Sequence, residues 1–108
     1  MQDRSTQIRA FSSEQRLEIL RLLKTPEVHF AGQWSADPAE FGVCMMLIAE
    51  ALGVAQPTAS RHVDLLRQAG FITVHRKGKW VYCRRQEEAL GDFLAWISET
   101  LGTDAPSA

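Results

Sequence analysis

Two helix-forming segments joined at a single glycine constrain the fold of this chain more than any other feature of its sequence. Residues 43–52 are mostly apolar, and Gly53 ends their helical pattern because glycine readily adopts the left-handed conformation that closes a helix. A second helix is predicted over residues 55–69, where Pro57 suits the first turn and Gly70 ends the pattern. The sequence thus predicts two helices that meet across a tight turn.

A β-hairpin is predicted immediately after this helix pair. Residues 71–76 and 79–85 are rich in β-branched and aromatic side chains, which favour strands. Lys77 and Gly78 lie between them and supply the positive φ that a tight turn needs. The order helix, turn, helix, hairpin over residues 43–85 is typical of a winged helix-turn-helix domain. The expected fold class is mainly α with a small β-hairpin.

Another helix is predicted ahead of this region, over residues 13–24. Ser12 and Gln15 have the spacing of a capping box at its start. Residues 25–41 show no sustained period and predict a long loop, in which residues 37–40 favour one helical turn. The loop carries His29, Phe30, Trp34 and Phe41, and a long connection so rich in rings is more typical of a functional segment than of a disordered one.

The last predicted helix covers residues 87–101 and is amphipathic. Its apolar side chains span an arc too wide for one small domain to cover, which indicates a partner beyond that domain. The side chains expected at this contact are Leu90, Phe93, Leu94, Ile97 and Leu101. Residues 1–101 are predicted to form one domain, and residues 102–108 a flexible tail.

Length and composition exclude several classes of protein. A chain of 108 residues with 45% apolar and 23% charged residues is typical of one packed soluble domain. Its two cysteines form no C-x-x-C pair, so neither a disulfide framework nor a self-contained zinc finger is predicted. No apolar run could span a membrane, and residues 1–7 lack the features of a signal peptide. We therefore expect a cytoplasmic protein without a membrane partner.

Charge is strongly segregated along the chain, although the net charge is only -1. Residues 54–86 carry seven Lys/Arg and one Asp/Glu, a balance of +6, whereas residues 87–108 carry five acidic residues and no Lys or Arg. Local positive potential can hold a polyanion even when distant parts of the molecule are acidic, because salt screens fields over about 8–10 Å. A solvated charged face is the alternative interpretation.

The basic region places polar side chains where a winged helix meets double-stranded DNA. Arginine and glutamine suit the base edges of the major groove, and basic side chains of a hairpin suit phosphates or the minor groove. The predicted DNA-binding residues are Gln56, Thr58, Ser60, Arg61 and His62 on the second helix, with Arg76, Lys77 and Lys79 on the hairpin.

The run IAEALGVAQPTASRHVDLLRQAG at residues 48–70 resembles the helix-turn-helix of the ArsR/SmtB transcriptional repressors. The likeness extends to QRLEIL at residues 15–20 and to GKWVY at residues 78–82. It implies a homodimer whose first and last helices form the interface, binding to operator DNA, and release by an inducer. The expected function is that of a sequence-specific DNA-binding transcriptional regulator, a repressor released from its operator by an effector of unknown identity.

The sensor region departs from the pattern of the family. Family members that bind arsenic or antimony have a Cys-x-Cys pair where this chain has only Cys44, and residues 87–101 lack the histidines of the zinc site on the last helix. We therefore predict no bound metal and no cofactor. Cys44 and His29 are the effector candidates, together with the loop at 25–41, although a cysteine at such a position is more often a small buried packing residue.

Two other functions stay open at this point. One is a winged-helix protein-interaction or RNA-binding module that recognises no operator. The other is a small enzyme that uses Cys44 with a histidine, but no phosphate-binding loop, carboxylate pair or Cys-His motif supports it, so the chain is not expected to be an enzyme. Trp34, Met45 and Met46 are predicted to be packing residues, and Cys83 a structural one.

Overall fold

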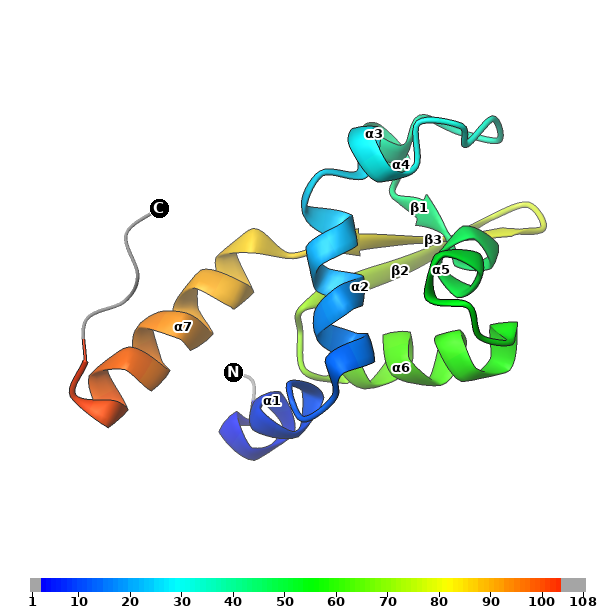
Figure 1. Cartoon of the computed structure of the whole chain (residues 1–108). Coiled ribbons are helices and arrows are strands. Elements are labelled where there is room, and N and C mark those ends of the chain that lie inside the picture. The colour runs from blue at the N-terminus through cyan, green and yellow to red at the C-terminus, as the bar shows by residue number, and fades with distance from the viewer. Residues whose placement is uncertain (1–2, 104–108) are drawn as a thin grey trace.

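A computed structural model of the chain describes residues 3–103, as seven helices around one small sheet (Figure 1). In chain order the elements are α1 (Arg4–Ala10), α2 (Glu14–Lys24), α3 (Pro26–His29), α4 (Pro38–Phe41), β1 (Val43–Cys44), α5 (Met45–Leu52), α6 (Gln56–Gln68), β2 (Ile72–Lys77), β3 (Trp80–Arg85) and α7 (Glu87–Leu101). The sheet is antiparallel with strand order β1-β3-β2. The predicted fold class, mainly α with a β-hairpin wing, is confirmed.

The turn between α5 and α6 has the predicted glycine at its centre. Gly53 has φ +70, and its N–H donates to the carbonyl of Glu50 while that of Val54 donates to the carbonyl of Ala49. These two bonds satisfy carbonyls that the end of α5 leaves without helical partners. The buried Ala49 and Ala59 are small enough to let the two helices pack closely.

The sheet has one strand more than the sequence predicts. Val43 and Cys44 pair with Cys83 and Tyr82 of β3, so the prediction of a helix from residue 43 is wrong and α5 begins at Met45. Gly42 explains the extra strand. Its φ of +99 and its approach to β3, where a Cβ atom would lie 2.6 Å from the Cys83 carbonyl oxygen, bring β1 against the hairpin. A two-residue strand is too short to leave a periodic signal.

The hairpin is displaced slightly from its predicted position. Lys77 ends β2 and pairs with Trp80, so the two-residue loop consists of Gly78 and Lys79 rather than Lys77 and Gly78. Gly78 has φ +61, as a tight turn of this length requires.

The side chains of the sheet alternate between its two faces. Residues directly opposite in an antiparallel pair share a face, so Val43, Val74 and Cys83 point to one side while Cys44, His75 and Tyr82 point to the other. Cys44 and Cys83 therefore project to opposite faces, which rules out a disulfide between them in this register. Cys83 is fully buried in the hydrophobic core, in agreement with the structural role predicted for it, and burial raises the pKa of its thiol to about 12.

The sequence predicted a loop over residues 25–41 with one helical turn at residues 37–40, whereas the structure has two short helices in this segment. The segment contains α3, which the periodicity did not reveal because it is a single turn, and α4, which begins at Pro38 after the cap Asp37 as expected. This segment lies above the sheet, on the side opposite α6 (Figure 1). It therefore forms an extra layer over the wing.

The N-terminal region contains a helix that the sequence did not predict. In α1, Asp3 is the N-cap and accepts from the Thr6 N–H. The following helix is capped by Ser13, which accepts from the Arg16 N–H, so the prediction of Ser12 as the cap is wrong by one residue. The hydroxyl of Ser12 donates instead to the Arg9 carbonyl at the end of α1.

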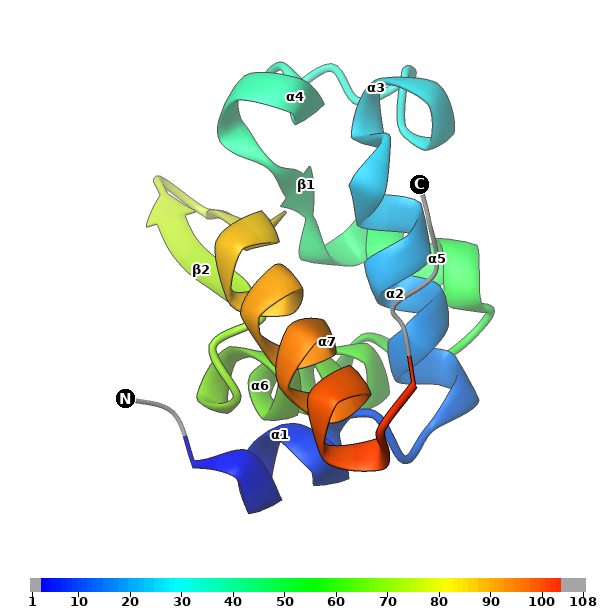
Figure 2. The same ribbon diagram turned by 90° about the vertical axis from the view of Figure 1, so that its left-hand side faces the viewer.

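Side-chain contacts join α1 to α7, and in Figure 2 α7 runs down toward α1. Arg4 forms an ion pair with Asp92 at 3.2 Å and lies over the ring of Trp96. Phe11, Phe71 and Phe93 form one aromatic cluster with ring centroids 4.9–5.5 Å apart, in which Phe11 stacks on Phe71 and Phe93 meets both rings edge to face. These contacts hold the last helix against the start of the domain.

Among the described residues, no helix is long and apolar enough to cross a membrane. The last helix ends at Leu101, as predicted, and Gly102 with φ +73 closes it. Most of the predicted tail, residues 104–108, lies outside the described residues.

Candidate nucleic-acid interface

Helix α6 presents polar side chains on its outer side. Ala59, Val63 and Leu66 are buried and anchor the inner side against the core. The helix positions facing away are exposed, and they include four predicted DNA-binding residues: Gln56, Thr58, Ser60 and Arg61. The first turn of α6 is also exposed, and its N-cap Ala55 supplies no side-chain hydrogen bond.

The wing carries the three predicted basic residues, Arg76, Lys77 and Lys79, and all are exposed. The ammonium group of Lys77 lies 4.1 Å from the centre of the Phe41 ring, and that of Lys79 lies 5.1 Å from the Trp80 ring. These cation–π contacts orient both side chains without neutralising their charge. The wing tip is thus a positioned source of positive charge.

A hollow of about 310 Å³ joins the helix to the wing. Gln56 and Ser60 of α6 line it on one side and Arg76 of β2 on the other, so the structure brings predicted contacts from both elements together. Asp64 also lines this hollow, but Arg67 and Gln68 donate to its carboxylate. Those hydrogen bonds lower the pKa of Asp64 and keep the carboxylate occupied.

His62 differs from the other predicted DNA-binding residues. Its ring is half-buried and faces α2, where Nδ1 lies 3.1 Å from Arg16 and Nε2 lies 2.7 Å from Gln15. Burial lowers the pKa of His62, and the positive charges of Arg16 and Arg61 lower it further.

Four side chains of the segment above the sheet hold this segment to the sheet. The buried Gln33 accepts from the Cys44 N–H at 2.8 Å and donates to the Gly42 carbonyl at 3.0 Å. Ser35 accepts from the Tyr82 hydroxyl at 2.8 Å, and the rings of Trp34 and Trp80 meet edge to face. The fourth contact is that of Phe41 with Lys77. Gln33 was missed by sequence reasoning, because a lone glutamine in a loop carries no recognisable signal.

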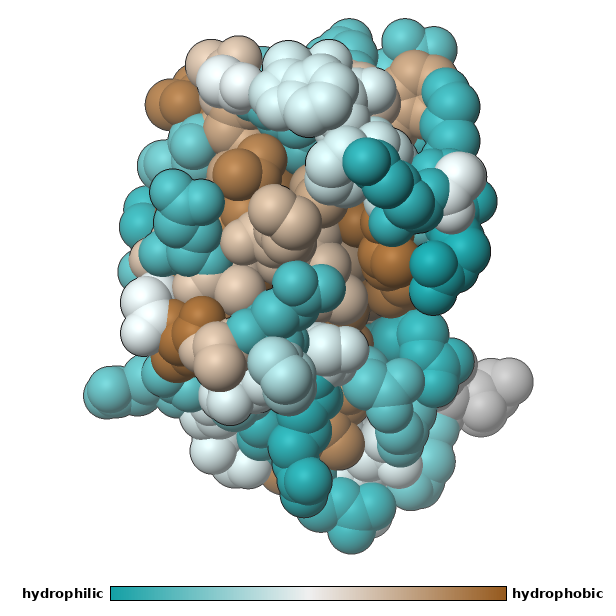
Figure 3. All heavy atoms as spheres, turned by 90° about the vertical axis from the view of Figure 1, so that its right-hand side faces the viewer, coloured by the Kyte–Doolittle hydropathy of each residue, from teal (hydrophilic) through white to brown (hydrophobic). Residues whose placement is uncertain are grey.

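An apolar groove lies beside α6 and the wing. It has a volume of about 260 Å³ and lies between α5 and the hairpin, with Gln56 and Lys79 at its edge; its other lining residues are Cys44, Met45, Met46, Trp80 and Val81. Figure 3 shows the face that carries the wing tip, with apolar side chains gathered near its centre and hydrophilic ones around them. Met46 and Trp34 are 52% and 83% exposed, so the prediction that they are packing residues is wrong, whereas Met45 is buried.

The two effector candidates are not brought together. Cys44 is 5% exposed and lines the groove, whereas His29 is exposed on α3 and lines a separate hollow with Gln33, Leu47 and Glu50. Among residues 3–103, no three His, Cys, Asp or Glu side chains form a group that could hold a metal ion.

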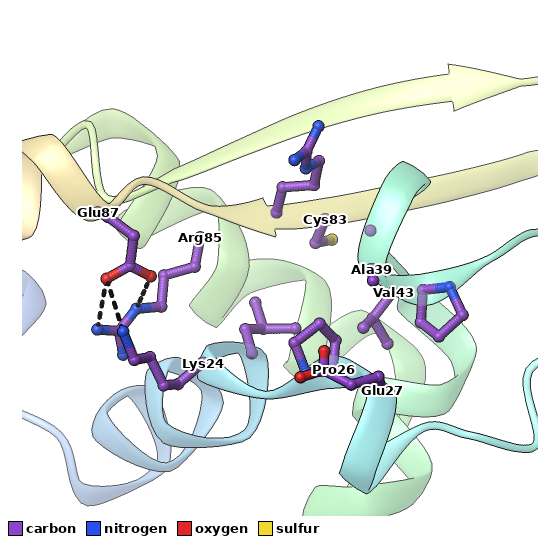
Figure 4. A pocket seen from close by; sticks show the side chains of 12 residues that line it. Lys24, Pro26, Glu27, Ala39, Val43, Cys83, Arg85 and Glu87 are labelled. Atoms are coloured by element: carbon purple, nitrogen blue, oxygen red, sulfur yellow. Dashed lines mark hydrogen bonds and ion pairs between the residues drawn. The ribbon is translucent and has the colours of Figure 1, made fainter.

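A further pocket, of about 250 Å³, lies between the sheet and α2, α3 and α4 (Figure 4). Glu87, at the start of α7, accepts from Arg85 at 2.7 Å and from Lys24 at 3.4 Å on one wall. These hydrogen bonds lower the pKa of Glu87, with that from Arg85 contributing most. The ion pairs join the end of α2 to the start of α7.

The five apolar residues predicted for a contact on the last helix fall into two groups. Leu90 and Phe93 are buried in the core of their own domain. Leu94 and Leu101 are 51% and 71% exposed, and Ile97 is partly buried. Ile8 on the neighbouring α1 is also 47% exposed, so both helices leave apolar surface uncovered.

Comparison with known proteins gives several similar regulators, although no protein-family model matches the chain. The chain is 44% identical over 89 residues to YbzH, an uncharacterized HTH-type transcriptional regulator of Bacillus subtilis, which covers 80% of this chain and 89% of that protein. It is 32% identical over 89 residues to the transcriptional repressor SdpR of the same organism, with 82% of each chain covered. These relatives are transcriptional regulators, in agreement with the expectation that the chain is not an enzyme.

Solved structures of winged helix-turn-helix regulators are similar to the structure of this chain. The crystal structure of an ArsR family transcriptional regulator is similar with a TM-score of 0.69 and 18% identity, covering 91% of this chain and 86% of that one. A homodimeric winged helix-turn-helix DNA-binding domain from Mycobacterium bovis, a possible ArsR-family regulator solved by NMR, has a TM-score of 0.60 and 23% identity over 91% of this chain and 77% of that one. The chain belongs to the ArsR family of winged helix-turn-helix transcriptional regulators.

Proposed function

We propose that this DNA-binding regulator is a cytoplasmic repressor that reads double-stranded operator DNA with α6 and holds the flanking backbone with its wing. The observation that carries the proposal is the exposed set of polar side chains on α6 beside three exposed basic side chains of the hairpin. Gln56 and Arg61 have the chemistry to bind base edges, while Thr58 and Ser60 can bind bases or phosphates. Arg76, Lys77 and Lys79 would bind phosphates or the minor groove.

A homodimer formed through α1 and α7 fits the surface of this regulator. Ile8, Leu94 and Leu101 are exposed apolar side chains on two adjacent helices, and a second copy would remove them from water. Two α6 helices would then enter successive major grooves about 34–36 Å apart, and the operator would be an inverted repeat. Two similar proteins support the proposal: SdpR is a repressor, and the domain from M. bovis is a homodimer.

The effector is proposed to act at Cys44 and the segment that covers the wing. A small molecule in the apolar groove would touch Cys44, Gln56 and Lys79 together, and these belong to the covered sheet, the reading helix and the wing tip. Occupation of the groove or oxidation of the thiol would therefore change the interface with DNA directly. His29 is a second candidate, in a separate hollow.

Selection of bound duplexes from a random pool tests both parts of the proposal. The protein should enrich an inverted repeat, and release of that duplex should then be measured with candidate small apolar ligands, oxidants and soft metal ions. Cys44→Ser should shift the response to the active compound, whereas Cys83→Ser, which alters the cysteine on the other face, should respond like the parent. Failure to enrich any sequence would refute operator recognition, and an identical response of parent and Cys44→Ser would refute the role of the thiol.

A further inference from the structure

The imidazole of His62 belongs to α6 but has both nitrogens engaged inside the protein. Nδ1 lies 3.1 Å from Nη1 of Arg16, and Nε2 lies 2.7 Å from Oε1 of Gln15, both on α2. The side chains of Thr58 and Arg61, which flank His62 on the same helix, are exposed. A base or phosphate could therefore bind His62 only by displacing one of its two partners.

The proton on this ring follows from the chemistry of its partners. A guanidinium only donates hydrogen bonds, so Nδ1 of His62 must accept from Arg16. The ring is then neutral and carries its proton on Nε2, which donates to the Gln15 carbonyl oxygen. No other tautomer satisfies both contacts, and a doubly protonated ring would lose the bond to Arg16.

Arg16 connects this ring to a third element. Its Nε donates to the Ala10 carbonyl at 2.8 Å and its Nη2 to the Arg9 carbonyl at 3.0 Å. These carbonyls lie in the last turn of α1, where the regular helical bonds end, and that of Arg9 also accepts from Ser12. All three nitrogens of one planar guanidinium are thus used, two on α1 and one on α6.

We propose that Arg16 and neutral His62 are a positioning pair, which fixes the orientation of α6 on α2 and α1 and thereby supports DNA recognition without contact to DNA. This inference rests on the proposed role of α6 as the reading helix. Because α1 is also part of the proposed dimer contact, the pair gives a direct path from that contact to the reading helix.

Arg16→Lys tests whether the hydrogen-bond geometry of the Arg16 side chain, rather than its positive charge, supports DNA binding. Lysine keeps the positive charge but cannot bind two carbonyls of α1 and a ring nitrogen of α6 through a rigid fork. We expect operator affinity to fall about tenfold, because one charge-assisted contact to α6 is lost. The slope of log affinity against log salt should stay that of the parent, since no phosphate contact is removed.

Two control variants calibrate this measurement. Lys77→Ala, on the wing, should reduce the salt slope by about 0.9 if it removes one phosphate contact. Arg21→Lys changes an exposed arginine on the same helix whose side chain pairs with Glu18, and it should bind like the parent. An unchanged operator affinity in Arg16→Lys would overturn the proposal.

His62→Ala tests the second member of the pair, because alanine can neither accept from Arg16 nor donate to Gln15. It should lower operator affinity as Arg16→Lys does, and the double variant should lose little more than either single one, because both remove the same contact. A reduced salt slope in His62→Ala would instead show direct contact of His62 with phosphate and overturn the proposal. Thermal unfolding of each variant ensures that binding is compared between folded proteins.

A nitrogen-15 NMR spectrum of the histidine rings tests the pair without DNA. At pH 7, His62 should be neutral with its proton on Nε2, and Arg16→Lys should mix the two tautomers. A ring protonated on Nδ1 in the parent would overturn the proposal. If the tautomer is as expected but Gln56→Ala and Arg61→Ala leave operator affinity unchanged, the reading role of α6 fails while the pair remains.

Discussion

The two longest helices of this regulator, α6 and α7, are both amphipathic, yet their exposed sides differ in chemistry. Helix α6 buries Ala59, Val63 and Leu66 and exposes amide, hydroxyl and guanidinium groups. Helix α7 buries Leu90 and Phe93 but leaves Leu94 and Leu101 in contact with solvent. The buried side chains of both helices belong to one core, so the two helices differ in the chemistry of their exposed side chains.

The two helices also lie in parts of the chain with opposite charge. The basic part of the chain, residues 54–86, includes α6 and the wing, whereas residues 87–108 contain only acidic charges. A polyanion is attracted to the first surface and repelled by the second. An apolar strip with an acidic surround excludes DNA but can accept another protein surface, which is why we assign a second copy to α7.

The largest expected effect is the loss of the dimer in Leu94→Asp. The substitution would bury an unpaired carboxylate in the proposed contact, and the dimer dissociation constant should rise at least about 100-fold. Because Leu94 is half-exposed within its own domain, the chain should still fold. Sedimentation and circular dichroism measure the two properties.

Leu65→Asp is the matched control on α6, where this leucine is 36% exposed. It should leave the dimer intact and weaken DNA binding through the added negative charge. A dimer of parental strength in Leu94→Asp would contradict the assignment of α7.

Gly42→Ala should cause the next largest effect, a loss of about 3 kcal/mol in the free energy of unfolding. The φ of +99 disfavours alanine, and its Cβ would meet the Cys83 carbonyl and the Arg84 side chain at 2.6 Å. Urea unfolding measures this change. Gly32→Ala, whose Cβ would meet no atom within 4 Å, should be nearly neutral, and equal losses in both variants would argue against strain at Gly42.

Arg61→Ala should reduce operator affinity by roughly tenfold or more and affect random DNA far less. A bidentate contact to a base contributes about 1–3 kcal/mol of discrimination, whereas a phosphate contact contributes none. Lys77→Ala, on the wing, should weaken both kinds of binding alike. Competition titrations with operator and random duplexes measure the ratio, and an unchanged ratio in Arg61→Ala would place the reading residues elsewhere.

The smallest expected effect is a dependence of stability on pH that arises from His62. Its pKa is lowered in the folded state from the ordinary value of 6.5, so the unfolded chain binds the proton more readily. The resulting stabilisation is complete above pH 6.5 and is lost as the pH falls through the lowered pKa. Urea unfolding of the parent and His62→Gln should diverge between pH 7 and pH 5, and parallel curves would contradict this contribution.

Local signals were enough to predict most of the regular elements. Gly53 and Gly70 mark the ends of α5 and α6 because few other residues adopt a positive φ cheaply. The 3.6-residue period of α7 fixed its bounds at residues 87–101, and Gly78 indicated the hairpin, although the turn lies one residue later than predicted. The type of side chain on α6 also predicted the polar surface that the structure exposes.

Local signals failed wherever a contact from a distant part of the chain decides the structure. Strand β1 exists only because Gly42 lets residues 43–44 reach β3, and α1 is held by Trp96, Asp92 and Phe93 from the other end of the chain. Neither contact leaves a periodic pattern in its own segment. The ring-rich segment at 25–41 had a clear composition, but its position over the wing depends on Tyr82, Trp80 and the Cys44 backbone.

The sequence by itself determined the order of the elements, the division of charge and the set of polar residues on α6, because helix ends, turns and composition are properties of neighbouring residues. Only the tertiary structure decided that His62 faces Arg16 rather than solvent, that Cys44 and Cys83 project to opposite faces, and which residues of α7 the domain itself covers. The physical reason is that the direction of a side chain depends on helix packing and strand register, which elements distant in the sequence set together.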